Sequence, residues 1–223
     1  MKLKLIKMIN ETYDARSLRF SRDKSFNFKP GQFIVFILKD QQGEFRRAYS
    51  ISTSPDEKEF FEITIKETPN GRASKILLKE AKINDEFEAL GPYGTFIYNN
   101  ENVKNIIYIA AGSGIAPIRA IINYILKNKH EIKQILLFSN KTEKDIIFKK
   151  EFEKLPIEKI YTLTRENHKE HKNGRIDKNL LKEHTKEDSL YFICGPPLFV
   201  DSMVNELKSL NIKQEQIKTE RYD

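Results

Sequence analysis

The sequence has a single cysteine, Cys194, among its 223 residues. One thiol excludes an internal disulfide framework, a zinc site built on cysteines and an iron–sulfur cluster held by this chain alone. No apolar run approaches the roughly 20 residues that a transmembrane helix needs. The first eight residues alternate lysine with apolar residues, unlike the continuous apolar stretch of a signal peptide. These absences predict a cytoplasmic protein without a transmembrane segment.

The chain is basic, but its basic residues do not form a cluster. It has 39 Lys and Arg against 32 Asp and Glu, which gives a formal charge of +7. The lysines are spread along the whole chain, whereas a nucleic-acid interface gathers them in a stripe with aromatic residues between them. The charge therefore favours solubility, and no nucleic-acid partner is expected. Disorder throughout is excluded, because 15 Phe residues and many Ile and Leu provide enough apolar mass for a core.

Residues 1–98 have the pattern of a small antiparallel β-barrel. Short segments of period two, or continuously apolar, are separated by turns rich in glycine and proline. One short helix is predicted at Arg72–Glu80. The predicted strands are Leu3–Asn10, Ser17–Ser21, Gln32–Lys39, Arg47–Ser52, Phe60–Lys66 and Glu86–Leu90.

A polar segment at residues 98–102 leads into a second half, 103–223, with a different pattern of apolar residues. Apolar strands alternate with helical segments there, which is typical of a doubly wound parallel sheet. The sequence therefore predicts two domains, 1–98 and 103–223. The predicted strands are Asn105–Ala111, Gln134–Ser139, Lys159–Thr164, Ser189–Cys194 and Gln216–Arg221. The predicted helices are Pro117–Lys127, Glu143–Lys154, Asp177–Glu183 and Leu198–Leu210.

Two loops of the second half are candidates for nucleotide binding. The segment Gly112–Pro117 lies between a strand and a helix, where glycines let backbone N–H groups approach a phosphate. The segment Cys194–Pro197 follows a later strand, and the carboxyl ends of parallel strands share one edge of the sheet. Both loops are therefore expected to line one crevice. Taken singly, each also fits an ordinary turn, and Cys194 also fits a buried structural thiol.

Two segments of the first half are candidates for binding a phosphorylated cofactor. The strand segment Arg47–Ser50 carries a charge for a phosphate, an aromatic face for stacking and a hydroxyl donor. The segment Gly71–Ser74 lies at a turn-to-helix junction, which is a second candidate phosphate site. Taken singly, Tyr49 also fits a barrel aromatic residue and Arg47 a surface charge.

Taken together and in order, these motifs resemble those of the ferredoxin–NADP reductase superfamily. The resemblance rests on Arg47–Ser50, Gly71–Ser74, Gly91–Phe96, Gly112–Pro117 and Cys194–Pro197, and on the acidic-x-aromatic tail Glu220–Tyr222. It implies a barrel that binds FAD, followed by a domain that binds NAD(P)H. The implied activity is hydride transfer from NAD(P)H to FAD, with electrons passed to a separate ferredoxin, flavodoxin, cytochrome or oxygenase component. The alternative is an electron-transfer subunit that is active only within a larger complex.

The resemblance also implies roles for individual residues. Tyr49 would stack on the isoalloxazine, Arg47 would neutralise the pyrophosphate, and Ser50 would hydrogen-bond near flavin N5. Further flavin contacts are implied for Ala48, Ile65, Lys66, Gly71, Arg72, Ala73, Ser74 and Tyr222. Contacts with the nicotinamide nucleotide are implied for Gly112, Ser113, Gly114, Pro117, Cys194, Gly195 and Pro196. The implied catalytic residues are Ser50, Cys194 and Glu220.

The choice of nucleotide depends on the segment Leu136–Phe148, which is similar to that of the NADH-using cytochrome reductases of the superfamily. Asn140 and Glu143 are poor partners for a ribose 2′-phosphate, although the lysines at 141 and 144 are able to serve. NADH is therefore favoured, and NADPH stays open. No metal site is predicted. The four histidines are expected on the surface, away from the motifs: His130, His168, His171 and His184.

Overall fold

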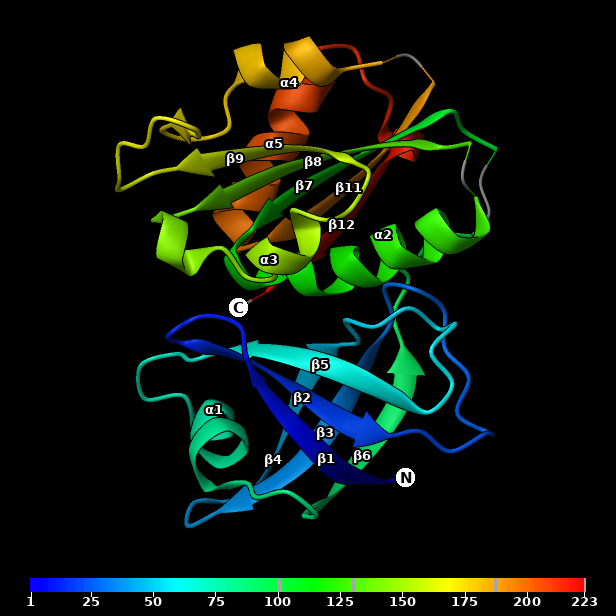
Figure 1. Cartoon of the computed structure of the whole chain (residues 1–223), viewed down its shortest axis with the longest axis vertical. Coiled ribbons are helices and arrows are strands. Elements are labelled where there is room, and N and C mark those ends of the chain that lie inside the picture. Colours follow the sequence, from blue (N-terminus) through cyan, green and yellow to red (C-terminus); the bar gives the residue numbers. More distant parts are fainter. Residues whose placement is uncertain (100–101, 130, 187, 223) are drawn as a thin grey trace.

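The computed structural model describes residues 1–99, 102–129, 131–186 and 188–222. Two six-stranded sheets follow one another along the long axis of the molecule, and Figure 1 shows the N-terminal sheet below the C-terminal one. The predicted joint at residues 98–102 includes residues 100 and 101, which lie outside the described part of the chain. The architecture confirms the predicted fold class, an antiparallel barrel-like unit followed by a parallel α/β unit.

The N-terminal sheet is antiparallel and has the strand order β4-β3-β6-β1-β2-β5. A bridge between Ile51 and Ile63 links the end of β4 to β5, which draws the two outer strands together. Alternation along each strand builds the core, because successive side chains point to opposite faces. In β1, for example, Leu3 and Leu5 are buried between exposed lysines. The strands are β1 (Lys2–Asn10), β2 (Ala15–Ser21), β3 (Phe33–Asp40), β4 (Gly43–Ser50), β5 (Phe60–Lys66) and β6 (Glu86–Tyr93).

The C-terminal sheet is parallel and has the strand order β10-β9-β8-β7-β11-β12. Helices α2 and α3 cover the face toward the barrel, and α4 and α5 cover the opposite face (Figure 1). No helix in the described part of the chain is long and apolar enough to cross a membrane. The strands are β7 (Asn105–Ala111), β8 (Lys133–Asn140), β9 (Glu158–Leu163), β10 (Lys172–Asn173), β11 (Ser189–Gly195) and β12 (Ile217–Arg221). The helices are α2 (Ile115–Asn128), α3 (Lys149–Phe152), α4 (Lys178–His184) and α5 (Pro197–Ser209).

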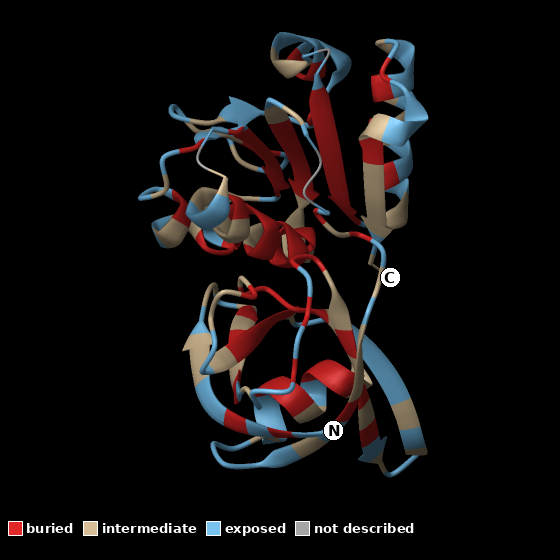
Figure 2. Ribbon diagram, turned by 90° about the vertical axis from the view of Figure 1, so that its right-hand side faces the viewer, coloured by how far each residue is buried: buried red, intermediate tan, exposed pale blue. Residues whose placement is uncertain are grey.

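The central strands of this sheet are buried on both faces, as Figure 2 shows. In β7, Ile106 and Tyr108 pack into the core beneath α2, whereas Ile107 and Ile109 pack into the core beneath α4 and α5. A strand covered on both faces needs apolar residues at every position, which explains its continuous apolar run.

Arg119 of α2 links the two sheets through buried charge. Its Nη1 atom lies 2.8 Å from Oε2 of Glu62 on β5, and its Nη2 atom lies 2.8 Å from Oε2 of Glu151 on α3. Glu62 is 2% exposed and also binds Arg19 of β2 at 2.8 Å. Burial lowers the pKa of Arg119, but the two glutamates more than offset this, and the net pKa lies above its usual value. The pairing therefore holds α2 against the barrel.

Two predicted helices differ from the structure. Glu143–Lys154 is not one helix: a 3-10 turn at Glu143–Asp145 is followed by Phe148 with φ +61°, and only then by α3. The Asp145 carboxylate accepts from the backbone nitrogen of Thr142 in a capping box and also binds Lys66 of the barrel at 2.9 Å, and the buried Phe148 ring packs on Phe152. The predicted helix over residues 72–80 divides into α1 (Arg72–Ser74) and a π-helical turn over residues 75–80.

Candidate active site

The two glycine loops of the C-terminal sheet are in direct contact. A Cβ atom placed on Gly114 would lie 2.2 Å from the carbonyl oxygen of Cys194 and 2.7 Å from the nitrogen of Gly195. Only glycine allows this approach, because no real Cβ atom tolerates contacts below 3.0 Å. The loops therefore line one edge of the sheet, as expected from the topology.

Gly112 leaves open space at the start of α2. Its φ is +53°, and a Cβ atom built there would meet no atom within 4 Å. The residues 112–114 form a 3-10 turn, and α2 begins at Ile115 with Gly114 as its N-cap. No side chain caps this end, and no acidic residue lies in the first turn. Unpaired N–H groups at such an end favour an anion, so the turn fits a nucleotide phosphate.

The C-terminal tail brings distant residues together across the two sheets. Strand β12 pairs with β11 so that Glu220 stands opposite Cys194, and the Tyr222 nitrogen donates to the Gly195 carbonyl at 3.0 Å. The hydroxyl of Tyr222 donates to Oγ of Ser50 at 2.6 Å, and Ser50 Oγ donates to Oε2 of Glu220 at 3.2 Å. The three predicted catalytic residues therefore lie in one cluster with Tyr222.

Burial sets the protonation of this cluster. It raises the pKa of Glu220 to about 7, with the Ser50 hydrogen bond opposing the rise. Burial, and then the nearby Glu220 carboxyl, hold the pKa of Cys194 well above its usual value. Cys194 therefore stays a thiol at neutral pH and is a weak nucleophile, whereas Glu220 changes its charge in that range.

The raised pKa of Glu220 predicts a pH-dependent stability. Between the ordinary value of 4.5 and about 7, the folded protein binds more protons at this group than the unfolded chain does. The contribution of Glu220 to stability is therefore present below this range and is lost as pH rises through it. Relative to the wild type, Glu220→Gln should gain stability between pH 5 and pH 8 in urea unfolding. Parallel pH profiles for the two proteins would contradict this pKa.

The predicted flavin residues Arg47 and Tyr49 lie on the same face of β4. The Tyr49 ring is half-buried and packs edge-on against Phe36, with the ring centroids 6.0 Å apart. Burial raises the pKa of Tyr49 to about 12, so the phenol stays neutral. Arg47 is exposed and hydrogen-bonds to Tyr49. The pair offers an aromatic surface with an exposed cation beside it, as a flavin nucleotide requires.

The turn Gly71–Ser74 opens on a cavity of about 550 Å3, which the hairpin between β3 and β4 also lines. A Cβ atom on Gly71 would lie 2.5 Å from Oγ of Ser74, so the backbone is drawn tightly around the helix start. Arg72 makes two bonds to Asp40 across the cavity, at 2.6 and 2.7 Å. This pairing lowers the pKa of Asp40 and holds the Arg72 guanidinium on the Asp40 carboxylate.

The other residues predicted to contact the flavin or the nucleotide lie in different parts of the structure. The Lys66 ammonium binds Asp145 at 2.9 Å and Asp14 at 3.3 Å, so it faces the interface between the sheets. Ala48 is exposed on β4, and Pro196 is exposed at the start of α5. Ile65 is buried within β5, in the core of the barrel, and Ala73 and Pro117 are buried in the segments already described.

The structure places Arg165 beside Lys141, a neighbour that the sequence did not reveal. The nitrogens of Thr164 and Arg165 donate to the carbonyls of Asn140 and Lys141 at 3.0 and 2.8 Å, so the ends of β8 and β9 run side by side. In the sequence, the segment after the second strand is the candidate for recognising a 2′-phosphate. The strand order was the missing information, because it places Arg165, which follows β9, beside that segment.

The expectation that the histidines lie apart on the surface is wrong for His171. Its side chain is 8% exposed, and its ring stacks on His168 with the centroids 4.4 Å apart. His168 is 23% exposed and His184 is 16% exposed. His130 lies outside the described residues. The His-x-x-His spacing was the only signal of this pair in the sequence.

Comparison with known proteins agrees with this geometry. Residues 2–98 match the oxidoreductase FAD-binding domain, and residues 108–205 match the oxidoreductase NAD-binding domain. The chain is 31% identical over 216 residues to NADH-cytochrome b5 reductase 1 of Mortierella alpina, covering 91% of this chain and 72% of that protein. A solved ferredoxin NADP+ reductase from Neisseria gonorrhoeae, with bound FAD and NADP, superposes with a TM-score of 0.87 at 22% identity, over 99% of this chain and 98% of that chain.

The fold and the two matched domains define the class of protein, an oxidoreductase with an FAD-binding domain followed by an NAD-binding domain. The chain belongs to the ferredoxin–NADP reductase superfamily, which confirms the resemblance seen in the sequence. It is also 32% identical over 153 residues to the glycine betaine monooxygenase reductase subunit of Pseudomonas aeruginosa. That match covers 68% of this chain and only 42% of the subunit, so the chain spans less than half the length of that relative.

Proposed function

We propose that this protein is an FAD-dependent oxidoreductase that takes hydride from NAD(P)H and passes electrons to a separate acceptor. The main support is the contact of the Gly114 and Cys194 loops beside the Ser50–Glu220–Tyr222 cluster, where the barrel and the parallel sheet meet. Ferredoxin, flavodoxin, cytochrome and oxygenase components are the candidate acceptors, because relatives include reductase components of monooxygenases and a cytochrome b5 reductase. The predicted cytoplasmic location is part of this proposal.

The residues of this chain would bind and orient the two cofactors and would hold or release a proton. Bound FAD supplies the two-electron chemistry, which no side chain provides. Tyr49 and Arg47 would hold the cofactor from the barrel, and the N-terminus of α2 would hold the nucleotide from the sheet. These residues would hold the two cofactors from opposite sides, so that hydride transfer would not depend on a collision between free reactants. Ser50 links Tyr222 to Glu220, so Oε2 of Glu220 would hold or release a proton near neutral pH.

Anaerobic titration tests the proposal and the choice of nucleotide together. Protein reconstituted with FAD should lose its flavin absorbance band when NADH is added, and it should reduce an artificial acceptor in steady state. Failure to bind flavin under all reconstitution conditions would end the proposal. Flavin bleaching without turnover would favour the alternative, an electron-transfer subunit that works only within a larger complex.

We propose NADH as the preferred nucleotide. The Glu166 carboxylate accepts from the Glu143 nitrogen at 2.7 Å, so two acidic residues stand where a 2′-phosphate would approach. NADH should exceed NADPH in kcat/KM by about tenfold, which equals ~1.4 kcal/mol. Arg165→Gln should leave the NADH value unchanged. Preference for NADPH, lost in Arg165→Gln, would instead show that Arg165 and Lys141 form a phosphate site.

Substitutions on β4 test the position of the flavin. Tyr49→Ala should weaken FAD binding by removing the stacking surface. Arg47→Ala should weaken it by removing a charge-assisted hydrogen bond, about 1.5–3 kcal/mol or roughly 10- to 150-fold in affinity. Arg46→Ala is the matched control, because Arg46 is equally exposed but points to the other face of the strand. Equal FAD affinity in all three variants, measured by fluorescence titration, would place the cofactor elsewhere.

A further inference from the structure

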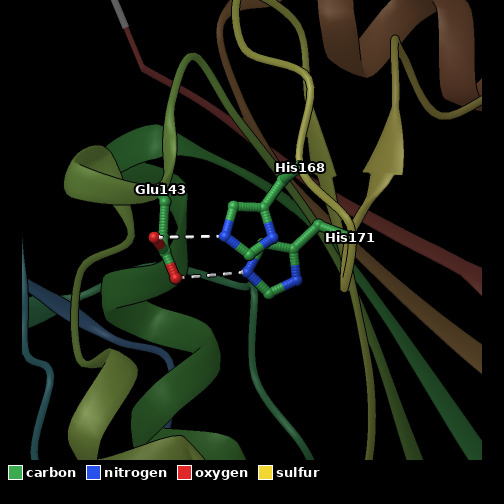
Figure 3. A group of neighbouring side chains, drawn as sticks. All are labelled: Glu143, His168 and His171. Atoms are coloured by element: carbon green, nitrogen blue, oxygen red, sulfur yellow. Dashed lines mark ion pairs between the residues drawn. The ribbon is translucent and has the colours of Figure 1, made fainter.

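Three side chains converge at the carboxyl edge of the C-terminal sheet, outside the cluster around Ser50. Glu143 opens the turn after β8, and His168 and His171 come from the loop after β9 (Figure 3). The Nε2 atom of His168 lies 3.4 Å from Oε2 of Glu143, and Nε2 of His171 lies 3.6 Å from Oε1. Both ring nitrogens therefore face the same carboxylate.

The spacing suits a shared metal ion. One ligand atom from each residue lies within 4.8 Å of the other two. Zinc binds imidazole nitrogen and carboxylate oxygen at about 2.0–2.2 Å in tetrahedral geometry, which separates neighbouring ligand atoms by about 3.4 Å. The 3.4 Å separation between Nε2 of His168 and Oε2 of Glu143 matches this value and is too long for a strong hydrogen bond, whereas the 3.6 Å separation of His171 is to Oε1, the other oxygen of the carboxylate. Imidazole and carboxylate together suit Zn2+ better than Mg2+ or Ca2+, which prefer all-oxygen sites.

His171 provides an independent observation. Its side chain is 8% exposed, and its Nε2 atom has no hydrogen-bond partner in the described part of the chain. A buried polar atom without a partner is costly, so native structures rarely leave one unpaired. The Tyr161 ring fixes the imidazole edge-on, with the centroids 5.3 Å apart. The free nitrogen is therefore held in place and directed at Glu143.

Two contacts limit the affinity of the cluster. Lys149 already binds Oε1 of Glu143, which leaves Oε2 as the oxygen available to an ion. The Glu170 nitrogen donates to Nδ1 of His168 at 3.2 Å, which favours a proton on Nε2. Metal binding must move that proton to Nδ1 and open the weak contact with Glu170. Both costs weaken binding, and the affinity for the metal falls further as pH decreases.

We propose that Glu143, His168 and His171 form a binding site for a divalent transition-metal ion, with Zn2+ as the best fit. The sequence predicted no metal site, because the three residues come from two loops that only the pairing of β8 with β9 brings together. The ion would lie beside the end of β8, next to the edge of the sheet that we propose binds the nucleotide. Its presence does not depend on the proposed oxidoreductase activity.

Isothermal titration of the full chain with Zn2+, with Co2+ absorption as a second probe, tests the proposal. One ion should bind per chain, and His168→Ala and Glu143→Gln should each lower the affinity at least tenfold. Lys149→Met should raise it, because it frees Oε1. His184→Ala is the matched control, since His184 also pairs with a glutamate, Glu158, at 3.3 Å but belongs to no cluster of three such ligands in the described part of the chain.

Thermal unfolding of each variant shows whether it is folded. His168→Ala is the decisive variant, because His168 is more exposed than His171 and its loss leaves the core intact. A folded His168→Ala protein that binds Zn2+ like the wild type would overturn the proposal. So would an equal loss of affinity in His184→Ala, or the absence of Zn2+ binding by the wild-type chain.

Discussion

Gly114→Ala is expected to abolish reduction of the flavin by NADH and to destabilise the fold. The new Cβ atom would lie 2.2 Å from the Cys194 oxygen and 2.5 Å from its carbonyl carbon. These backbone atoms belong to β11, which pairs with β7 on one side and β12 on the other, so they cannot move away. Overpacking of this kind typically costs about 1–3 kcal/mol, and a rigid backbone neighbour puts this case at or above the upper end. Urea unfolding and anaerobic reduction kinetics measure both effects.

Gly112→Ala is the matched control for this substitution. Gly112 has a φ of +53°, but a Cβ atom there meets open space. The variant should lose only about 1–2 kcal/mol from the left-handed backbone and should stay folded. Equal losses of stability in the two alanine variants would show that the Gly114 and Cys194 loops do not meet as described.

Glu62→Gln is expected to cause the largest loss of stability among single polar substitutions. Glu62 is 2% exposed and binds both Arg119 and Arg19 at 2.8 Å. Removing its charge takes this counter-ion from Arg19 and leaves Arg119 with only the more exposed Glu151, and breaking a buried pair costs about 3–5 kcal/mol. The free energy of unfolding in urea measures this loss directly.

Glu151→Gln provides the comparison, because Glu151 binds the same Arg119 but is 31% exposed. Water can solvate the site there, so the loss should be near ~1 kcal/mol. Since Arg119 joins the helix layer to the barrel, Glu62→Gln should also separate the unfolding of the two sheets into distinct transitions. A single transition with equal losses in both variants would contradict the role assigned to Glu62.

Local patterns were sufficient to predict most elements of the fold. The alternation in β1 shows that one face of the strand is buried, and the continuous apolar run of β7 shows that both faces are buried. Every residue along a strand contributes to such a pattern, so it can be recognised in the sequence. The helix predicted at residues 143–154 is interrupted in the structure. Asp145 binds Lys66 of the barrel and Phe148 packs into the hydrophobic core, and these contacts involve residues that lie far away in the sequence.

The sequence by itself determined the two-part architecture and the loops that carry Gly112, Gly114 and Cys194. The residue types of a turn and the period of apolar residues depend only on neighbours in the sequence, so they can be recognised in a single sequence. Tertiary structure alone decided which loops touch. The tail reaches Ser50 through 172 residues of separation, Arg165 stands beside Lys141, and His171 faces Glu143. Strand order and the packing of one sheet on the other create these contacts, and neither is encoded in the spacing of residues along the chain.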